Sequence, residues 1–159
     1  MRTPQNIITL AEEKLETAEF LINGNYFDDA YYIAGYALEL YLKARICKTL
    51  DIFDLFDFDK NKNRSLPLPQ GAKTSVGDNL YKPFKVHDYN QLFILSGLFT
   101  EFENKLKTDI GLKSDWFIVS LWNEDLRYSI EKKSKKESED LLNSIKKIIL
   151  WLKQYLSTI

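Results

Sequence analysis

Residues 27–49, FDDAYYIAGYALELYLKARICKT, are the stretch that decides the fold. Apolar residues recur there every three or four positions, which is typical of an α-helix. One stripe is made mostly of small side chains, which let another backbone approach closely: Ala30, Ala34, Ala37, Tyr41 and Ala44. A second stripe holds Leu38, Leu42 and Ile46. Two apolar faces indicate a helix covered on more than one side, so we predict a central helix from about Phe27 to Thr49.

The remaining face of this helix is polar and carries Tyr32, Tyr36, Glu39 and Lys43. Glu39 is the only acid between residues 30 and 49, and a lone carboxylate on a buried helix needs a cationic partner. Lys43 is one helical turn away and can form an intrahelical ion pair. Arg127 is the stronger candidate, because a planar guanidinium can grip a carboxylate with two parallel hydrogen bonds. We therefore expect Glu39 and Arg127 to form a partly buried pair.

Capping signals define a first and a last helix. Thr3 followed by Pro4 is an N-cap and first-turn pair, and Thr9 with Glu12 offers a competing capping box a few residues later. Gly24 and Asn25 supply a C-terminal stop before the central helix. Ser134 and Glu137 form a capping box, and apolar residues at helical spacing then continue to the C-terminus. The sequence thus predicts one long helix on either side of the middle of the chain.

The middle of the chain is predicted to hold two more helices. Asp88 with Gln91 marks a helix start, and apolar residues continue at helical spacing to Leu106. Gly111 is expected to close that region, and Ser114 to cap a short, largely buried, tryptophan-rich helix. No segment shows sustained strand alternation. The predicted fold is all-α: an up-and-down bundle of four to five helices in a single domain, residues 1–159.

A long irregular insertion separates the central helix from the third one. The helical period fails over residues 51–86, which contain three prolines and two glycines. Loops of more than about 12 to 15 residues in compact domains tend to be functional or mobile. Two interpretations stay open: a variable insertion whose phenylalanines pack on the bundle, or a lid or partner-binding arm.

Composition excludes several classes of function. The 159 residues have a formal net charge of -1, which argues against a domain that holds nucleic acid through bulk positive charge. Cys47 is the only cysteine and His87 the only histidine, so neither a disulfide nor a two-histidine metal site can form within the chain. We expect no metal and no cofactor. No continuous apolar segment resembles a signal peptide or a membrane span, so no membrane association and a cytoplasmic location are expected.

Two segments carry a family resemblance. The first combines Gly24, Asn25 and Tyr26 with the run YALELYLKA at residues 36–44, and the second is the run WFIVSLW at residues 116–122, followed by Leu126, Arg127 and Tyr128. His87 and Asp88, at the start of the third helix, fit more weakly. Together these segments resemble the HEPN family of small prokaryotic helical-bundle proteins. The resemblance spans the chain apart from residues 51–86.

The resemblance implies a bundle that dimerises. HEPN members act as RNA-cutting toxins, as partners of minimal nucleotidyltransferases, or as non-catalytic domains associated with RNA or nucleotides. The nuclease members carry an arginine, four to six further residues and then a histidine. Counting from Arg127, positions 132 to 134 hold Lys132, Lys133 and Ser134, so the motif is absent. Lysine is a poor general base near neutrality, which removes the usual means of activating a ribose oxygen.

Two functions from different classes follow. The first is a non-catalytic or divergent HEPN-like binding domain that acts through a homodimer, a nucleotidyltransferase-type partner, RNA or a nucleotide. Its expected polar cluster contains Glu39, Lys43, Arg127, Tyr128, Tyr32 and Tyr36. The alternative is a metal-independent ribonuclease of the toxin type that uses Arg127, Tyr128 and His87. The alternative requires His87 to lie within hydrogen-bond reach of Arg127, either within one chain or across a dimer.

Overall fold

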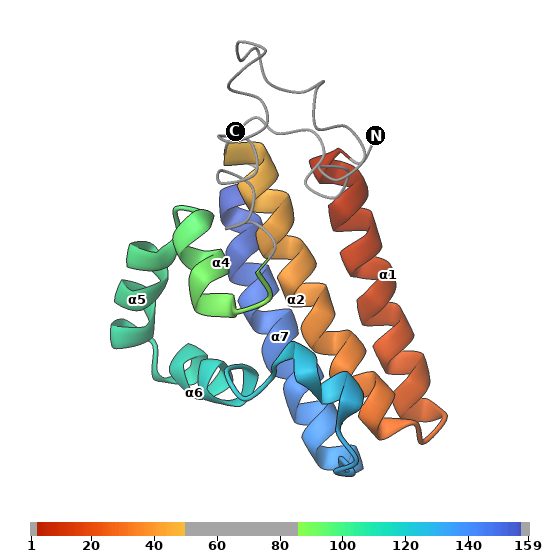
Figure 1. Cartoon of the computed structure of the whole chain (residues 1–159). Coiled ribbons are helices and arrows are strands. Elements are labelled where there is room, and N and C mark those ends of the chain that lie inside the picture. The colour runs from red at the N-terminus through yellow and green to blue at the C-terminus, as the bar shows by residue number, and fades with distance from the viewer. Residues whose placement is uncertain (1–2, 50–85, 157–159) are drawn as a thin grey trace.

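The computed structural model describes residues 3–49 and 86–156, and every regular element in these ranges is helical. The elements, shown in Figure 1, are α1 (Pro4–Asn23), α2 (Phe27–Thr49), α4 (Tyr89–Leu95), α5 (Phe99–Thr108), α6 (Ile110–Val119), the 3-10 helix η2 (Glu124–Tyr128) and α7 (Lys135–Leu156). The predicted all-α class is confirmed. The insertion predicted at residues 51–86 lies outside the described residues except for Val86, so both of its interpretations stay predictions.

Helix α2 occupies the centre of the molecule, as predicted. It lies beside α1 and α7 and also contacts α4 and η2 (Figure 1). Both of its apolar stripes are buried, and so are Glu39 and Lys43 on its polar face. The turn from α1 closes at Gly24, whose N–H donates to the Phe20 carbonyl at 3.0 Å, and Asn25 adopts a positive φ of 64°. The predicted end of the first helix is therefore confirmed.

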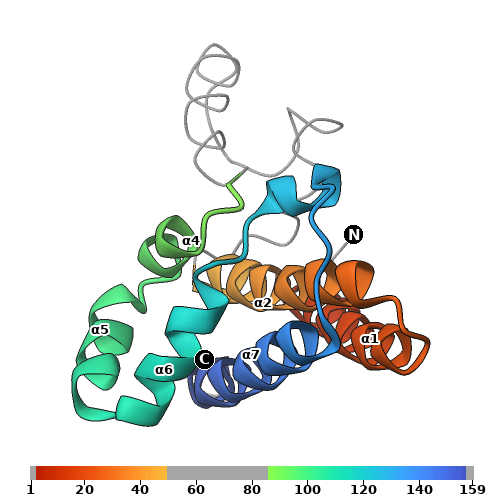
Figure 2. The same ribbon diagram turned by 90° about the horizontal axis from the view of Figure 1, so that it is seen from below.

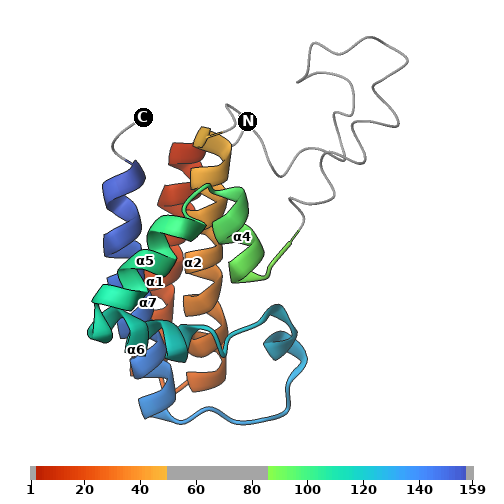
Figure 3. The same cartoon turned by 90° about the vertical axis from the view of Figure 1, so that its left-hand side faces the viewer.

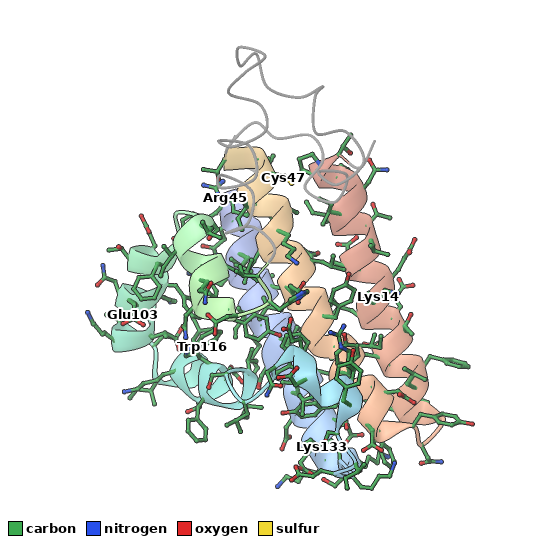
Figure 4. The ribbon with its side chains drawn as sticks, viewed as in Figure 1. Lys14, Arg45, Cys47, Glu103, Trp116 and Lys133 are labelled. Carbon is green, nitrogen blue, oxygen red and sulfur yellow. The ribbon has the colours of Figure 1, made fainter. Side chains whose placement is uncertain are left out.

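Helix α7 lies alongside α2, and the C-terminal ends of the two helices lie together. There Arg45 Nη1 donates to the Tyr155 carbonyl at 2.6 Å, and Lys48 Nζ donates to the Leu156 carbonyl. The last carbonyls of a helix have no intrahelical donor, so these two cations of α2 stabilise the end of α7. Figure 4 shows Arg45 at this end of the molecule and Lys133, just before α7 begins, at the opposite end.

The capping signals at both ends of the chain are confirmed. The Thr3 hydroxyl accepts a hydrogen bond from the Asn6 N–H at the start of α1. At the start of α7, the Ser134 hydroxyl accepts from the Glu137 N–H at 3.2 Å, and the Glu137 carboxylate accepts from the Ser134 N–H at 2.8 Å. These reciprocal bonds satisfy amides that the helix itself leaves free.

The third predicted helix is two helices. Its start is correct, because the Asp88 carboxylate accepts from the Gln91 N–H at 2.9 Å. Its continuation to Leu106 is wrong, because the helix ends at Leu95 and a turn through Gly97, with φ of 73°, leads into α5. The turn folds α5 back so that the Phe93 and Phe102 rings stack at 4.2 Å between centroids.

The predicted boundaries of the tryptophan-rich helix are also wrong. Asp109 caps α6, since its carboxylate accepts from the Leu112 N–H at 2.9 Å. Gly111 and Ser114 consequently lie inside α6. The helix is less buried than predicted: Phe117 is 69% exposed, and Trp116 is only partly buried. Helices α4, α5 and α6 form a group on one side of the three long helices, as Figures 2 and 3 show.

None of the helices in the described ranges combines the length and the apolar character that a membrane crossing requires.

Candidate binding pocket around His87

The lack of a side chain at Gly35 leaves a notch in the surface of α2, and this notch positions the site. Gly35 lies in the middle of α2, and Trp122 packs directly on it: a Cβ at residue 35 would lie 2.2 Å from Trp122 Nε1. The indole N–H donates to the Tyr32 carbonyl at 3.2 Å, and the Tyr89 hydroxyl donates to the Gly35 carbonyl at 2.7 Å. The Tyr89 and Trp122 rings stack at 5.1 Å. The notch therefore fixes both the start of α4 and the segment that leads into η2.

Tyr89 stays a hydrogen-bond donor in this environment. Burial, with a smaller contribution from the negative charge of Glu39, raises the pKa of the Tyr89 phenol well above its ordinary value. A protonated phenol can donate to the Gly35 carbonyl, whereas a phenolate could not. The hydrogen bond from Tyr89 on α4 to Gly35 on α2 is thus kept at neutral pH.

Glu39 is the buried centre of the polar cluster. Its side chain is 1% exposed, and Oε1 accepts from Lys43 Nζ at 2.6 Å. His87 Nδ1 lies 2.9 Å from Oε1 and 3.0 Å from Oε2 of the same carboxylate. A buried carboxylate is tolerated only when it is paired and hydrogen-bonded, and here both of its oxygens are engaged. Glu39 thereby orients the His87 ring.

The predicted pair between Glu39 and Arg127 is wrong. Arg127 is exposed, and its guanidinium carbon lies 4.8 Å from the ring centroid of the neighbouring Tyr128, which is itself 75% exposed. Lys43 is on the same helix as Glu39, and His87 enters with α4, so these two residues satisfy the carboxylate. No hydrogen bond or ion pair in the described ranges joins Glu39 or His87 to Arg127.

The other nitrogen of His87 faces a second carboxylate. His87 Nε2 lies 3.1 Å from Glu124 Oε2, within ion-pair distance. The two groups are not aligned as a hydrogen bond, and Glu124 Oε2 is a buried acceptor without a hydrogen-bond donor among the described residues. A neutral imidazole has one N–H, and the Glu39 oxygens at Nδ1 engage it. In that state, Nε2 and Glu124 Oε2 are two neighbouring acceptors.

These groups line a pocket of about 190 Å³ between the start of α4, the end of α6 and the start of η2 with the two residues before it. Its aromatic residues are Tyr89, Trp116 and Trp122, its carboxylates are Asp88, Glu124 and Asp125, and Asn90, Ser120 and Asn123 add neutral polar groups beside His87. Trp116, labelled in Figure 4, contacts Tyr89 and the α4 residue Phe93. The lining thus combines aromatic rings with an excess of negative charge.

The expected polar cluster is assembled only in part. Glu39 and Lys43 are joined, and His87, one of the weak catalytic candidates, joins them. Tyr32 contributes its carbonyl to Trp122 and stacks on that ring at 6.0 Å, while Tyr36 is partly buried against the core.

Sequence reasoning missed the part of the pocket that lies around η2. The sequence pattern that could have predicted η2 is Asn123 followed by two acids. In the structure Asn123 caps η2, since its side chain accepts from the Asp125 N–H at 3.1 Å. An asparagine N-cap with acids in the first turn is a helix-start pattern that could have placed Glu124. Gly35, in the middle of a helix, was the second signal.

The fold and the site define an all-helical domain with an acidic, aromatic pocket organised by a buried carboxylate and a histidine. Within the described ranges, no group of three or more histidine, cysteine, aspartate or glutamate side chains is placed to hold a metal ion. Comparison of the chain with protein-family models, with curated proteins and with solved structures finds no match.

Proposed function

We propose that this chain is a HEPN-like helical domain that acts by binding a protein partner through the His87 pocket rather than by cutting RNA. The observation that carries the proposal is the pocket itself, with three carboxylates, Asp88, Glu124 and Asp125, around aromatic walls. The resemblance of residues 36–44 and 116–122 to HEPN proteins supplies the type of partner, which is a nucleotidyltransferase-type protein.

The charge of the pocket favours a protein over RNA. Nucleic acids are bound mainly through contacts of lysine and arginine with phosphates. The lysine next to Glu39 is already engaged, since Lys43 is buried against that carboxylate. The remaining acidic groups repel phosphate. A protein surface can present complementary positive charge.

The test is binding of the protein encoded by the neighbouring gene, which the proposal requires to be of the nucleotidyltransferase type. We expect the purified proteins to form a complex by calorimetry, and Glu124→Gln to weaken it by about tenfold or more. Glu131→Gln is the matched control, because Glu131 is exposed, carries the same charge and does not line the pocket. Equal affinity of the two variants, or no complex with the wild-type chain, would overturn the proposal.

A metal-independent ribonuclease is the second candidate, and one observation favours it. Glu39 holds His87 Nδ1 while Nε2 is directed towards the pocket, which is the arrangement of a carboxylate-oriented general base. The absence of the arginine-to-histidine spacing and the exposure of Arg127 speak against it.

An RNA cleavage assay separates the two functions. We expect the wild-type protein to cleave no more RNA than a His87→Ala or an Arg127→Ala variant. Reproducible cleavage that disappears in His87→Ala would identify the ribonuclease and reject the binding domain as the main function.

A further inference from the structure

We propose that the His87 pocket takes the guanidinium group of an arginine side chain. The inference rests on the proposed function, because a protein partner would present that side chain. It goes further by naming the chemical group that the pocket recognises, and it is argued from the size, the hydrogen-bonding character and the aromatic walls of the pocket.

The size of the pocket limits its occupant. Sites for drug-sized ligands enclose about 300 to 1,000 Å³. The pocket around His87 encloses about 190 Å³, which suits one side chain or one base but not a whole nucleotide. An occupant that is part of a macromolecule must therefore insert a single protruding group.

The hydrogen-bonding character of the pocket selects a donor. Glu124 Oε2 is a buried acceptor, and His87 Nε2 lies 3.1 Å from it. The carboxylate of Asp125 also lines the pocket. A guanidinium group has five N–H donors, no acceptor and a permanent positive charge, so it complements acceptors of this kind. A phosphate has only acceptors and would be repelled.

The aromatic residues favour a planar cation over an ammonium. Tyr89 and Trp122 are buried and stacked on one another, which fixes their rings, and Trp116 lies against Tyr89 at 6.1 Å between centroids. Trp116 is the partly exposed ring of the three, so a guanidinium in the pocket would stack on Trp116, while a lysine ammonium is a compact and more strongly hydrated charge. An arginine side chain thus satisfies both the acceptors and the rings.

The lysine paired with Glu39 does not oppose this occupant. Lys43 is buried, and its ammonium lies 2.6 Å from the Glu39 carboxylate, which neutralises it.

The test is a titration of the whole chain with N-acetyl-arginine methylamide, followed by NMR of the indole N–H signals. The chain has three tryptophans, and Trp151 lines a separate hollow with Lys105 and Asp109. We expect the signals of Trp116 and Trp122 to shift and that of Trp151 to stay. The citrulline analogue, which has the same shape without the charge, and guanosine should shift none of them.

Variants make the test specific to the carboxylates. Glu124→Gln should raise the dissociation constant of the arginine analogue about tenfold, because it removes a charge-assisted hydrogen bond. Glu131→Gln should leave it unchanged. Asp125→Asn is a second pocket variant, at an exposed position where loss of the fold is not expected, and it should also weaken binding. The spectrum of each variant shows directly whether it is folded.

Several outcomes would overturn the inference: no shift with the arginine analogue, an equal shift with citrulline, or a shift of Trp116 and Trp122 with guanosine alone. The last would indicate a base-binding pocket and RNA. If the neighbour-encoded protein binds through Glu124 but the arginine analogue does not, this inference fails and the proposed function stands. If the analogue binds and that protein does not, the proposed function fails and the guanidinium pocket stands.

Discussion

Replacing Gly35 with alanine tests whether the notch in α2 builds the site. A Cβ at this position would lie 2.2 to 2.3 Å from three atoms of the Trp122 indole, whereas non-bonded carbon atoms prefer about 3.5 to 4.0 Å. The indole would have to move by more than an ångström. Its hydrogen bond to the Tyr32 carbonyl would then be lost, at a cost of about 1 kcal/mol.

The expected net effect of Gly35→Ala is a loss of stability. Overpacking of a well-packed site costs about 1 to 3 kcal/mol. The higher helix propensity of alanine contributes about 1 kcal/mol in the opposite direction, which offsets the lost hydrogen bond. The free energy of unfolding should therefore fall by about 1 to 3 kcal/mol, measured by urea unfolding followed by circular dichroism.

The sign of the effect should reverse when the indole is removed. In a Trp122→Ala background the three closest contacts of the added Cβ are gone, so Gly35→Ala should stabilise by about 0.5 to 1 kcal/mol through helix propensity. Gly111→Ala in α6 is the control for propensity, because a Cβ there meets only the Asp109 carboxylate at an ordinary 3.4 Å. A neutral or stabilising Gly35→Ala in the wild-type chain, or the same change in both backgrounds, would refute the packing of Trp122 on Gly35.

Three further predictions concern the polar groups and assembly. Glu39→Gln should lower the free energy of unfolding by about 3 to 5 kcal/mol, because it leaves the Lys43 ammonium buried without its anion, whereas His87→Ala should cost less than half as much, since Glu39 and Lys43 stay paired. The hydrogen bond from Tyr41 lowers the pKa of Glu12 below its ordinary 4.5. A lowered pKa stabilises the folded state above pH 4.5 and this stability is lost as the pH falls through the folded value, so Tyr41→Phe should flatten the acid limb of a stability curve below that pH. Finally, light scattering at micromolar concentration should give twice the 18.7 kDa mass of the chain, and a monomer would reject the homodimer that the HEPN resemblance implies.

Local signals in the sequence were sufficient for the long helices. Thr3, Gly24 and the pair of Ser134 and Glu137 act through hydrogen bonds to amides and carbonyls within a few residues. The geometry of such caps depends on the nearby backbone alone, so their residue types predict helix ends without knowledge of the tertiary fold. The bounds of α2 followed from its apolar period in the same way.

The break between α4 and α5 needed a different kind of information. Apolar residues at helical spacing continue from Leu92 through Phe102, and nothing in that spacing shows that the chain turns back on itself. The turn depends on Gly97, which adopts a left-handed conformation that other residues rarely adopt. A single glycine within a helical period is compatible with both a helix and a turn. The stacking of Phe93 on Phe102, a tertiary contact, stabilises the turn.

The start of α6 was misplaced because two residues competed as caps. Ser114 and Asp109 are both good N-cap residues. The side chain of Asp109 accepts from the Leu112 N–H, while the Ser114 hydroxyl donates to the Ile110 carbonyl inside the helix. A serine hydroxyl can bond a backbone carbonyl one turn earlier, so its presence does not exclude a helix interior. An ionised aspartate has no hydrogen to donate to a backbone carbonyl inside a helix. Aspartate is therefore the stronger sequence signal for the start of a helix.

The partner of Glu39 shows where sequence reasoning about a polar site reaches its limit. The premise was sound, because Glu39 is fully buried and is paired with cations or hydrogen-bond donors. The expectation that Arg127 pairs with Glu39 compared only the strengths of the arginine and the lysine interaction. It did not consider which element of the fold brings each cation to Glu39. Lys43 reaches Glu39 along one turn of the same helix, so the fold has only to bury the pair. Arg127 would have to arrive from another element, and the notch at Gly35 instead fixes Trp122 and the chain after it so that Glu124 lies at His87. The pocket beside His87 is therefore lined by the carboxylates of Asp88, Glu124 and Asp125, and Arg127 is not among its lining residues.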